Sequence, residues 1–391
     1  MMSSHDFQVK PMIWYGKDCL QRLNDLSFKK VCIVTDKSMV KLGMLDPLTK
    51  ILDDLNVSYR IFDEVEPDPS LETVLSGLSH ILVTKPDLLI AVGGGSVIDA
   101  AKAIMFFCLR VKEEVIKPEK IVKPYFVAVP TTSGTGSEVT SYSVITDTKN
   151  GKKIPIKDKR MLPDVAILDT VFTSTLPKKV IANAGIDVLT HALEAYVSLE
   201  HHAMSDLYAL EAARKVSSCL TSMYDQVSDE KSRMEMHMAS CYGGIAFENS
   251  GLGLNHGMAH ALGGKFMLPH GQANALLIPH IIRYNCGDHM GGEETRKRYE
   301  TMAKVMAMAK GNKGDGKTEI IHQINQLTKH LELPSAIKDC GISEKEFLSS
   351  VPEMVKKALA DFTTSSNPRK PEAEDVVKIY LAAYYGVDSI R

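Results

Sequence analysis

The chain has 391 residues, of which 44% are hydrophobic and 24% are charged, and its formal net charge at pH 7 is −2. The length predicts two domains rather than one, and the composition is that of an ordinary globular protein. The near-zero charge argues against nucleic acid or a membrane surface as a partner, and no apolar run approaches the roughly 20 residues of a membrane-spanning helix.

Up to about residue 175, short apolar runs typical of strands alternate with segments whose apolar residues recur at helical spacing. This rhythm predicts a mostly parallel α/β sheet, and the unbroken apolar character of the runs predicts that both faces of the sheet are buried. The expected strands are Lys30–Thr35, Tyr59–Phe62, Leu88–Val92, Tyr125–Val129 and Val165–Leu168.

After about residue 178, strand-like runs nearly vanish and helical segments rich in alanine, leucine and methionine continue to the end. A domain boundary near Leu176-Pro177 fits this change. We therefore expect an α/β domain over residues 1–178 and an all-helical domain over residues 179–391.

A glycine-rich turn follows the third expected strand. It consists of Gly93, Gly94, Gly95 and Ser96, and a helical segment begins directly after it. Glycine lets backbone N–H groups approach an anion without a Cβ in the way, and the helix start adds free N–H groups. The turn favours a diphosphate, although it matches neither G-x-G-x-x-G nor the Walker loop. A tight turn without a ligand is the alternative.

Two further features stand at the ends of expected strands. Pro130–Glu138 supplies hydroxyl groups and two glycines at the sheet edge where such folds bind ligands. Asp36 can accept hydrogen bonds from both adenosine ribose hydroxyls and would repel a 2′-phosphate, which favours NAD over NADP. Asp36 as a helix N-cap or turn residue is the alternative. Because Asp36 precedes the glycine turn, the usual Rossmann order does not apply.

Five residues of the second domain are candidate metal ligands. Asp187 and His191 are spaced i, i+4, so they would lie about 5–6 Å apart on one helix face, close enough to share an ion. An ordinary surface Asp–His pair is the alternative. His256, His260 and His270 lie in an apolar, glycine-rich segment. One carboxylate and several imidazoles predict a divalent metal, and spacing alone makes both His256 and His260 ligands. The alternative for any one histidine is a hydrogen-bonded core residue.

The seven cysteines are scattered, odd in number and never arranged as Cys-x-x-Cys. This pattern favours free thiols in a reducing cytoplasm and argues against metal ligation by cysteine. The segment Met1–Phe7 has neither a basic region nor an apolar run, so we do not expect a secretory signal there.

Taken together, these motifs resemble those of the iron-containing (group III) alcohol dehydrogenases, relatives of dehydroquinate synthase and glycerol dehydrogenase. The resemblance covers nearly the full length and includes the histidine segment. It implies a dehydroquinate synthase-like fold, with an α/β dinucleotide-binding domain and an all-α metal-binding domain. The other matching segments are Val34–Lys37, Gly93–Lys102, Pro130–Glu138, Gly185–Glu194 and Ser366–Pro371.

The resemblance implies a different ligand set from the one that spacing alone gives. Asp187, His191, His256 and His270 would bind the metal, with iron favoured and zinc second. His260 would instead lie beside the nicotinamide and relay a proton as the catalytic residue.

The same resemblance implies the contacts of NAD. Val97 stands where the family often has proline, and its contact would be through the backbone. Asp68 stands where many members have asparagine, which leaves its role open. The implied cofactor-binding residues are Asp36, Gly93, Gly94, Gly95, Ser96, Val97, Asp99, Thr131, Thr132, Thr135 and Lys153.

The implied reaction is hydride transfer between NAD(H) and a short-chain primary alcohol or aldehyde of the ethanol, propanol and butanol class. Tyr142 and Phe247, joined by Leu252, would line the substrate pocket, and an apolar lining favours small alcohols over sugars. One methylene changes binding in such a pocket by only about 1–3 kcal/mol, so we expect broad specificity. The resemblance also implies a homodimer or a larger homo-oligomer.

Three other functions compete with this one. The first is a polyol dehydrogenase of the same superfamily, acting on a propanediol or glycerol. The second is a lyase of the dehydroquinate synthase type, which should line its site with cations for a phosphate substrate, whereas residues 183–196 and 250–275 carry only Lys265. The third is a metal- or nucleotide-binding protein without catalysis.

Overall fold

The computed structural model describes residues 6–115, 123–149, 152–287, 290–308 and 316–387. The chain forms two compact units, Val9–Thr175 and Leu176–Arg391, and the described N-terminal residues up to Gln8 belong to the second. The backbone N–H of Gln8 donates to Asn249 Oδ1 at 2.8 Å, and the Phe7 ring stacks on Tyr208. The sequence-based range 1–178 places these N-terminal residues with the α/β domain instead.

The first unit contains a six-stranded parallel sheet with the strand order β1-β8-β5-β4-β2-β3. The five strands expected from the sequence are present, and β1 is an additional edge strand. The expected sheet, mostly parallel and covered on both faces, is confirmed. The strands are β1 (Met12–Tyr15), β2 (Lys30–Val34), β3 (Ser58–Phe62), β4 (Leu88–Gly93), β5 (Tyr125–Pro130) and β8 (Val165–Leu168).

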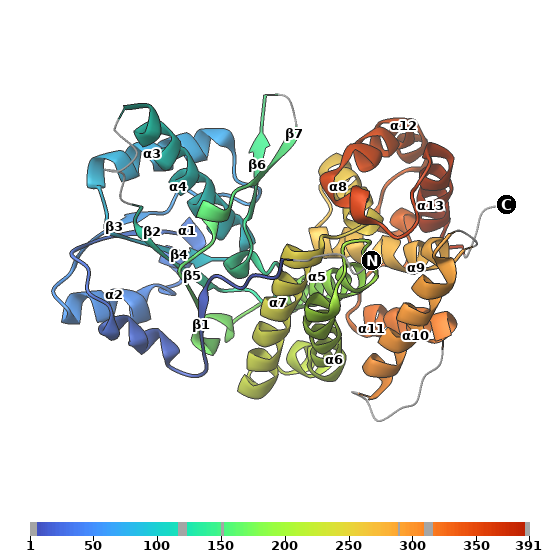
Figure 1. Cartoon of the computed structure of the whole chain (residues 1–391), viewed down its shortest axis with the longest axis horizontal. Coiled ribbons are helices and arrows are strands. Elements are labelled where there is room, and N and C mark those ends of the chain that lie inside the picture. Colours follow the sequence, from blue (N-terminus) through green and yellow to red (C-terminus); the bar gives the residue numbers. More distant parts are fainter. Residues whose placement is uncertain (1–5, 116–122, 150–151, 288–289, 309–315, 388–391) are drawn as a thin grey trace. The chain divides into compact units, whose positions relative to one another are not determined.

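Side chains that alternate along each strand build one apolar layer on each face of the sheet. Leu89 packs in the layer shared with α3 (Leu71–Thr84) and α4 (Gly95–Val115). Its neighbour Ile90 packs in the opposite layer with α2 (Asp46–Asp54). In Figure 1 these helices lie on the two sides of the sheet. Both faces are therefore covered, which explains why the strands are continuous apolar runs.

An antiparallel hairpin of β6 (Tyr142–Asp147) and β7 (Lys152–Lys157) stands apart from this sheet. The Ser143 hydroxyl donates to the backbone carbonyl of Asp99 at 2.7 Å, and the Thr146 N–H donates to that of Pro69 at 2.8 Å. The hairpin is thus joined to α4 and to the loop before α3, and it fixes the far end of the loop that follows β5.

The described part of the second unit is all-helical, as expected. Its longer helices are α5 (Lys178–Val197), α6 (Ala203–Asp225), α7 (Glu230–Ser250), α8 (Leu254–Phe266), α9 (His270–Asn285), α10 (Gly292–Met308), α11 (Gly316–His330), α12 (Glu344–Ala360) and α13 (Ala373–Tyr385). Helix α5 packs against α6, α7, α9 and α10, and every residue from Gly185 to Val197 is buried. Buried polar groups require partners, so the acids and histidine on this helix must be paired.

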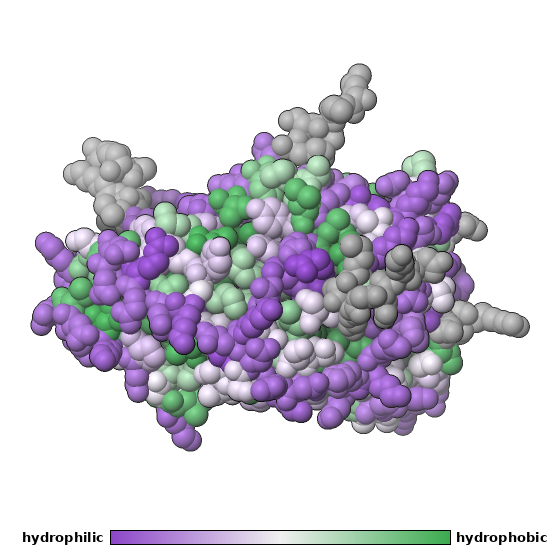
Figure 2. Space-filling view, turned by 90° about the horizontal axis from the view of Figure 1, so that it is seen from below, coloured by the Kyte–Doolittle hydropathy of each residue, from purple (hydrophilic) through white to green (hydrophobic). Residues whose placement is uncertain are grey.

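Figure 2 shows hydrophilic residues spread over the visible face, with hydrophobic residues in smaller groups between them. Within the described ranges, none of the helices combines the length and the apolar character that crossing a membrane requires. All seven cysteines are free.

Candidate active site

Three helices of the second unit bring the expected metal ligands together. Helix α5 carries Asp187 and His191 on one face, α8 carries His256, and His270 is the first residue of α9. Ligand atoms of Asp187, His256 and His270 all lie within 4.8 Å of one another. The resulting group has a single carboxylate, surrounded by imidazoles.

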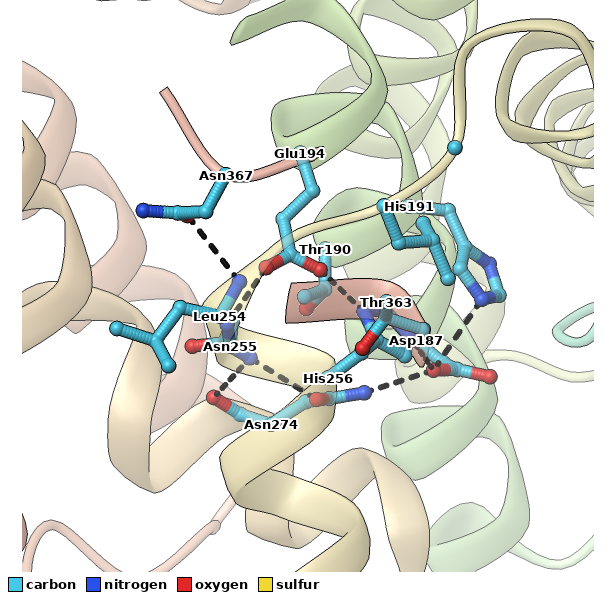
Figure 3. Close-up of polar contacts among 12 residues, drawn as sticks. Asp187, Thr190, His191, Glu194, Leu254, Asn255, His256, Asn274, Thr363 and Asn367 are labelled. Atoms are coloured by element: carbon cyan, nitrogen blue, oxygen red, sulfur yellow. Dashed lines mark hydrogen bonds and ion pairs between the residues drawn. The ribbon is translucent and has the colours of Figure 1, made fainter. Parts of the chain in front are cut away.

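The Asp187 carboxylate is the centre of this group. Its Oδ1 lies 3.3 Å from His270 Nε2, 3.6 Å from His256 Nε2 and 3.8 Å from His191 Nε2. Figure 3 shows His191 and Asn274 directed toward Asp187. Burial would raise the pKa of the Asp187 carboxyl, but the neighbouring imidazoles outweigh burial and hold that pKa well below its usual range. The carboxylate is therefore ionised at neutral pH and available to a cation.

Glu194 fixes the orientation of the His256 ring. Its carboxylate contacts His256 Nδ1, and both side chains are almost fully buried. A carboxylate that holds one imidazole nitrogen directs the other nitrogen outward, which is how proteins orient histidine ligands of metals. His256 Nε2 accordingly faces Asp187. The same glutamate accepts the backbone N–H of Asn255, which anchors the start of α8.

Two buried asparagines connect the same helices. Asn274 Nδ2 donates to Asp187 Oδ1 at 2.8 Å, and Asn274 Oδ1 accepts from Asn255 Nδ2 at 2.9 Å. Both side chains have no exposed surface. This chain of hydrogen bonds links α5, α9 and α8 and so fixes the carboxylate relative to the two histidine-bearing segments (Figure 3).

The residues present fit a divalent cation. His256 Nε2 is buried and has no hydrogen-bond partner among the described residues. Burial lowers the pKa of His256, but the negative charges of Glu194 and Asp187 overcome burial and raise that pKa to about 9. The site thus favours positive charge at the position of Nε2. A metal cation that replaces the proton on His256 Nε2 supplies that positive charge. His256 Nε2 then becomes a metal ligand.

Neither His260 nor His191 belongs to the group of three mutually close ligand atoms, although His191 Nε2 lies 3.8 Å from Asp187 Oδ1. His260 is placed differently. Its ring stacks on the His270 ring with centroids 5.2 Å apart, and its Nδ1 lies 2.9 Å from Asp361 Oδ2. This hydrogen bond occupies one ring nitrogen. The other ring nitrogen, Nε2, is not engaged by Asp361. The spacing-based prediction that His260 is a ligand and the expectation from the resemblance that it lies beside the nicotinamide both stay predictions.

In the first unit, the glycine turn meets the loop after β5. The N–H of Thr131 donates to the Gly93 carbonyl at 3.0 Å. A Cβ built on Gly95 would lie 2.6 Å from Thr135 Cγ2, and one on Gly94 would lie 3.5 Å from Thr132 Oγ1. Only glycine at position 95 allows this close approach. The threonine side chains thus stand beside a backbone turn at the start of the long helix α4, which fits a diphosphate.

Asp36 is the N-cap of the short helix α1 (Lys37–Lys41). Its Oδ1 accepts the backbone N–H of Ser38 at 2.8 Å and that of Met39 at 3.1 Å. The N-cap alternative is therefore realised. A cap uses one carboxylate oxygen and does not remove the negative charge, so a second role toward a ribose stays a prediction.

The remaining cofactor candidates have roles within the protein. Asp99 Oδ1 accepts the Ser137 hydroxyl at 2.6 Å, and its Oδ2 accepts the Val144 N–H at 2.9 Å. Val97 is 2% exposed, so only its backbone is available for a contact. Lys153 forms an ion pair with Asp68, and the Asp68 N–H donates to Ser96 Oγ at 3.3 Å. Asp68 thus connects Lys153 with the glycine turn.

The expected substrate-pocket residues belong to different units. Phe247 and Leu252 lie in the helical unit, where the Phe247 ring is 4.5 Å from the His191 ring and the Leu252 carbonyl accepts the Ser366 hydroxyl. Tyr142 begins β6 in the first unit, and Lys157 lies over its ring at 4.6 Å. Of the three, the structure brings Phe247 into contact with a metal-site residue.

Three residues of this site were not singled out from the sequence. Glu194 follows His191 by three positions, so a helical reading of α5 could have placed it on the same face. Asn274 follows His270 by four positions and could have been found in the same way. Asp361 has no local signal, because it is 101 positions from His260.

Sequence comparison identifies the family. Residues 11–170 match the model described as iron-containing alcohol dehydrogenase, and residues 181–384 match that of the C-terminal part of the Fe-containing alcohol dehydrogenase family. The chain belongs to the iron-containing alcohol dehydrogenase family. It is therefore an alcohol oxidoreductase, and the expected fold, an α/β domain followed by an all-α domain, is confirmed.

Three curated relatives illustrate this membership. The NADPH-dependent butanol dehydrogenase of Clostridium saccharobutylicum is 37% identical, over 98% of each chain. The 1-propanol dehydrogenase PduQ of Citrobacter freundii is 39% identical, over 94% of this chain and 96% of the relative. The aldehyde-alcohol dehydrogenase 2 of Entamoeba histolytica is 38% identical, over 97% of this chain, which spans only 47% of that longer relative.

Solved structures of related enzymes have the same fold as this chain. The iron-containing alcohol dehydrogenase of Thermococcus thioreducens has a TM-score of 0.88 at 31% identity, covering 97% of this chain and all (100%) of that one. A 1,3-propanediol oxidoreductase has a TM-score of 0.87 at 32% identity, covering 98% and 100%. A sulfoacetaldehyde reductase of Bifidobacterium kashiwanohense, solved with NAD+, has a TM-score of 0.84 at 26% identity, covering 98% and 99%.

Proposed function

We propose that this chain interconverts short-chain primary alcohols and aldehydes of the ethanol, propanol and butanol class by hydride transfer with NAD(H). The observation that carries the proposal is the group of Asp187, His256 and His270, with ligand atoms within 4.8 Å of one another. Asp187 and His256 are buried, and the His270 side chain is 40% exposed. His191 completes the proposed set of one carboxylate and three imidazoles. Such a set suits Fe(II) and Zn(II), and the family description favours iron, with zinc second.

Each residue of the site has a different role in the proposed reaction. When bound, the divalent cation supplies Lewis-acid polarisation of the alcohol or carbonyl oxygen. Glu194 keeps His256 Nε2 directed into the site, and Asp187 supplies the compensating negative charge. In oxidation, bound NAD would accept the hydride of the alcohol carbon and His260 would accept the hydroxyl proton, giving the aldehyde and NADH. Reduction returns both to the carbonyl group.

The choice of NAD over NADP rests on Asp36. Its charge at the end of β2 would repel a 2′-phosphate. The sulfoacetaldehyde reductase structure contains NAD+, which supports NAD, whereas the name of the Clostridium saccharobutylicum relative specifies NADPH. The close packing of the glycine turn against Thr132 and Thr135 supports the remaining proposed contacts, and Asp68 links Lys153 to the same turn. These contacts are Gly93, Gly94, Gly95, Ser96, Val97, Asp99, Thr131, Thr132, Thr135 and Lys153.

Asp36→Gly should raise kcat/KM for NADPH by about tenfold, because roughly 1.4 kcal/mol of repulsion on the 2′-phosphate is relieved. The loss of the cap should cost only a few tenths of a kcal/mol, since glycine is a good N-cap. Steady-state kinetics with both cofactors checks this. Asp229→Gly removes the capping charge of α7 and should leave the cofactor ratio unchanged. Unchanged NADPH use in Asp36→Gly would exclude Asp36 as the selecting residue.

The substrate class is proposed from the apolar side chains that the family resemblance assigns to the substrate, Tyr142, Phe247 and Leu252, and from the names of the butanol and propanol dehydrogenase relatives. A panel of simple alcohols, simple aldehydes and polyols tests it. Propionaldehyde and butyraldehyde should both be reduced, with kcat/KM values that differ by no more than about 200-fold, because one methylene is worth only about 1–3 kcal/mol. Turnover of 1,3-propanediol or glycerol without turnover of the simple alcohols would contradict the proposal.

Turnover of the polyols without turnover of the simple alcohols would instead support a polyol dehydrogenase. The likeness to a 1,3-propanediol oxidoreductase is the observation that favours this second candidate. Both candidates use the same metal site, so the substrate panel is what separates them.

We also propose a cytoplasmic location and a homodimer or larger assembly. The free state of all seven cysteines supports a reducing compartment. The assembly rests on the family resemblance, and sedimentation or light scattering of the purified protein tests it.

A further inference from the structure

His260 has a partner that is not part of the metal group. Its Nδ1 lies 2.9 Å from Asp361 Oδ2, and the two residues, on α8 and just after α12, are 101 positions apart. The His260 side chain is 28% exposed and the Asp361 side chain 16%. A partly buried carboxylate at this distance forms a directional hydrogen bond rather than a solvent-screened surface contact.

The other carboxylate oxygen of Asp361 is held independently. Asp361 is the N-cap of the 3₁₀ helix η7 (Phe362–Ser366). Its Oδ1 accepts the Thr363 backbone N–H at 3.0 Å and the Thr363 hydroxyl at 2.7 Å. The cap therefore fixes which oxygen points at His260.

From this geometry we infer that Asp361 is a positioning residue that keeps the proton of neutral His260 on Nδ1 and leaves Nε2 as the proton acceptor. The inference rests on the proposed function, in which His260 relays the proton of the alcohol. Asp361 itself contacts neither substrate nor cofactor in this role.

The protonation of Asp361 agrees with this assignment. Burial raises the pKa of Asp361, but the hydrogen bond with His260, the positive charge that His260 carries when it is protonated, and the bonds from Thr363 lower that pKa to about 2. The carboxylate is thus ionised and can only accept hydrogen bonds. The hydrogen between Asp361 Oδ2 and His260 Nδ1 must therefore belong to the imidazole.

The cap makes Asp361→Asn a sharp test. The Thr363 N–H needs an acceptor, so the asparagine carbonyl oxygen should remain at the cap and the amide nitrogen should face His260. An amide N–H group there requires Nδ1 to be the acceptor and moves the imidazole proton to Nε2. Nε2 then cannot accept the alcohol proton. Asp361→Ala instead removes the acceptor and the cap together, without imposing the wrong tautomer.

The two variants should rank in opposite orders for activity and for stability. Asp361→Asn should keep a near-wild-type melting temperature and KM but lose about 10²-fold in kcat, the scale of one proton-transfer group. Asp361→Ala should melt lower yet lose only about tenfold. Metal content should stay at the wild-type level in both variants. A role limited to capping predicts the reverse, with Asn near wild type in activity and Ala the poorer enzyme, and this result would overturn the inference.

His260→Ala and the double variant separate this inference from the function on which it rests. If Asp361 acts through His260, adding Asp361→Asn to His260→Ala should cause no further loss of kcat. A full additional loss would show that Asp361 acts elsewhere. If His260→Ala retains wild-type kcat, the proposed relay is wrong. If His260→Ala loses activity but Asp361→Asn does not, the relay stands and only the inference about Asp361 fails.

Discussion

His256→Ala is expected to lose bound metal and turnover together, with kcat/KM falling by about 10³-fold or more. A Lewis acid contributes several kcal/mol of transition-state stabilisation, and each 1.36 kcal/mol is a factor of ten. The variant removes the nitrogen that Glu194 directs into the site and leaves two buried carboxylates, Glu194 and Asp187, without the imidazole between them. Metal analysis and NADH oxidation on the same sample measure both effects.

The matched control is His330→Ala. His330 lies on the exposed part of α11, bonded to Asp225, and its loss should change neither metal content nor activity. Circular dichroism of both variants distinguishes a local loss from unfolding. A folded His256→Ala protein that retains stoichiometric metal and wild-type kcat/KM would contradict the proposed ligand set.

Gly271→Ala should damage the site through packing alone. A Cβ at this position would lie 1.9 Å from the backbone carbonyl oxygen of Asn183, a separation that no side-chain rotation can relieve. The start of α9 must therefore move away from α5, and His270 moves away from Asp187 with it. We expect a loss of about 1–3 kcal/mol in the free energy of unfolding, together with weaker metal retention and lower kcat. Thermal unfolding and metal analysis test this.

Gly264→Ala is the control for the same substitution in the neighbouring helix. A Cβ on Gly264 meets nothing within 4 Å, so alanine should be tolerated. In the helix interior it should be neutral or stabilise by up to about 1 kcal/mol. If Gly271→Ala behaved like Gly264→Ala, the close approach of α9 to α5 would not be what holds His270 in place.

The sequence predicted the elements whose signal is local. The central strands are uninterrupted apolar runs, and their ends in the structure differ from the expected ends by at most a residue. Strand β1 was not predicted because it is a four-residue edge strand with exposed ends, and because its pairing partner β8 lies at the other end of the unit's sequence. The β6–β7 hairpin was not predicted because β7 contains three lysines and a proline, which are uncommon in strands.

The site was predictable to the extent that its residues share a helix. Asp187 and His191 follow from their spacing on α5, and Glu194 could have been added by the same argument. The spacing of His256 and His260 alone cannot assign both to one metal, because two side chains one turn apart can contact different neighbours. What separates them is tertiary: Glu194 from α5 contacts His256, while Asp361 from the end of α12 contacts His260. Such pairings across helices leave no local pattern in the sequence.

The most direct test of the account is to measure NADH oxidation by propionaldehyde on protein purified without oxygen, with metal content determined on the same sample. A chelator should abolish activity, and restored activity should rise in proportion to the iron or zinc bound. Metal-free protein that keeps full activity would contradict the central claim. So would protein with a full complement of metal and no turnover of any simple alcohol or aldehyde.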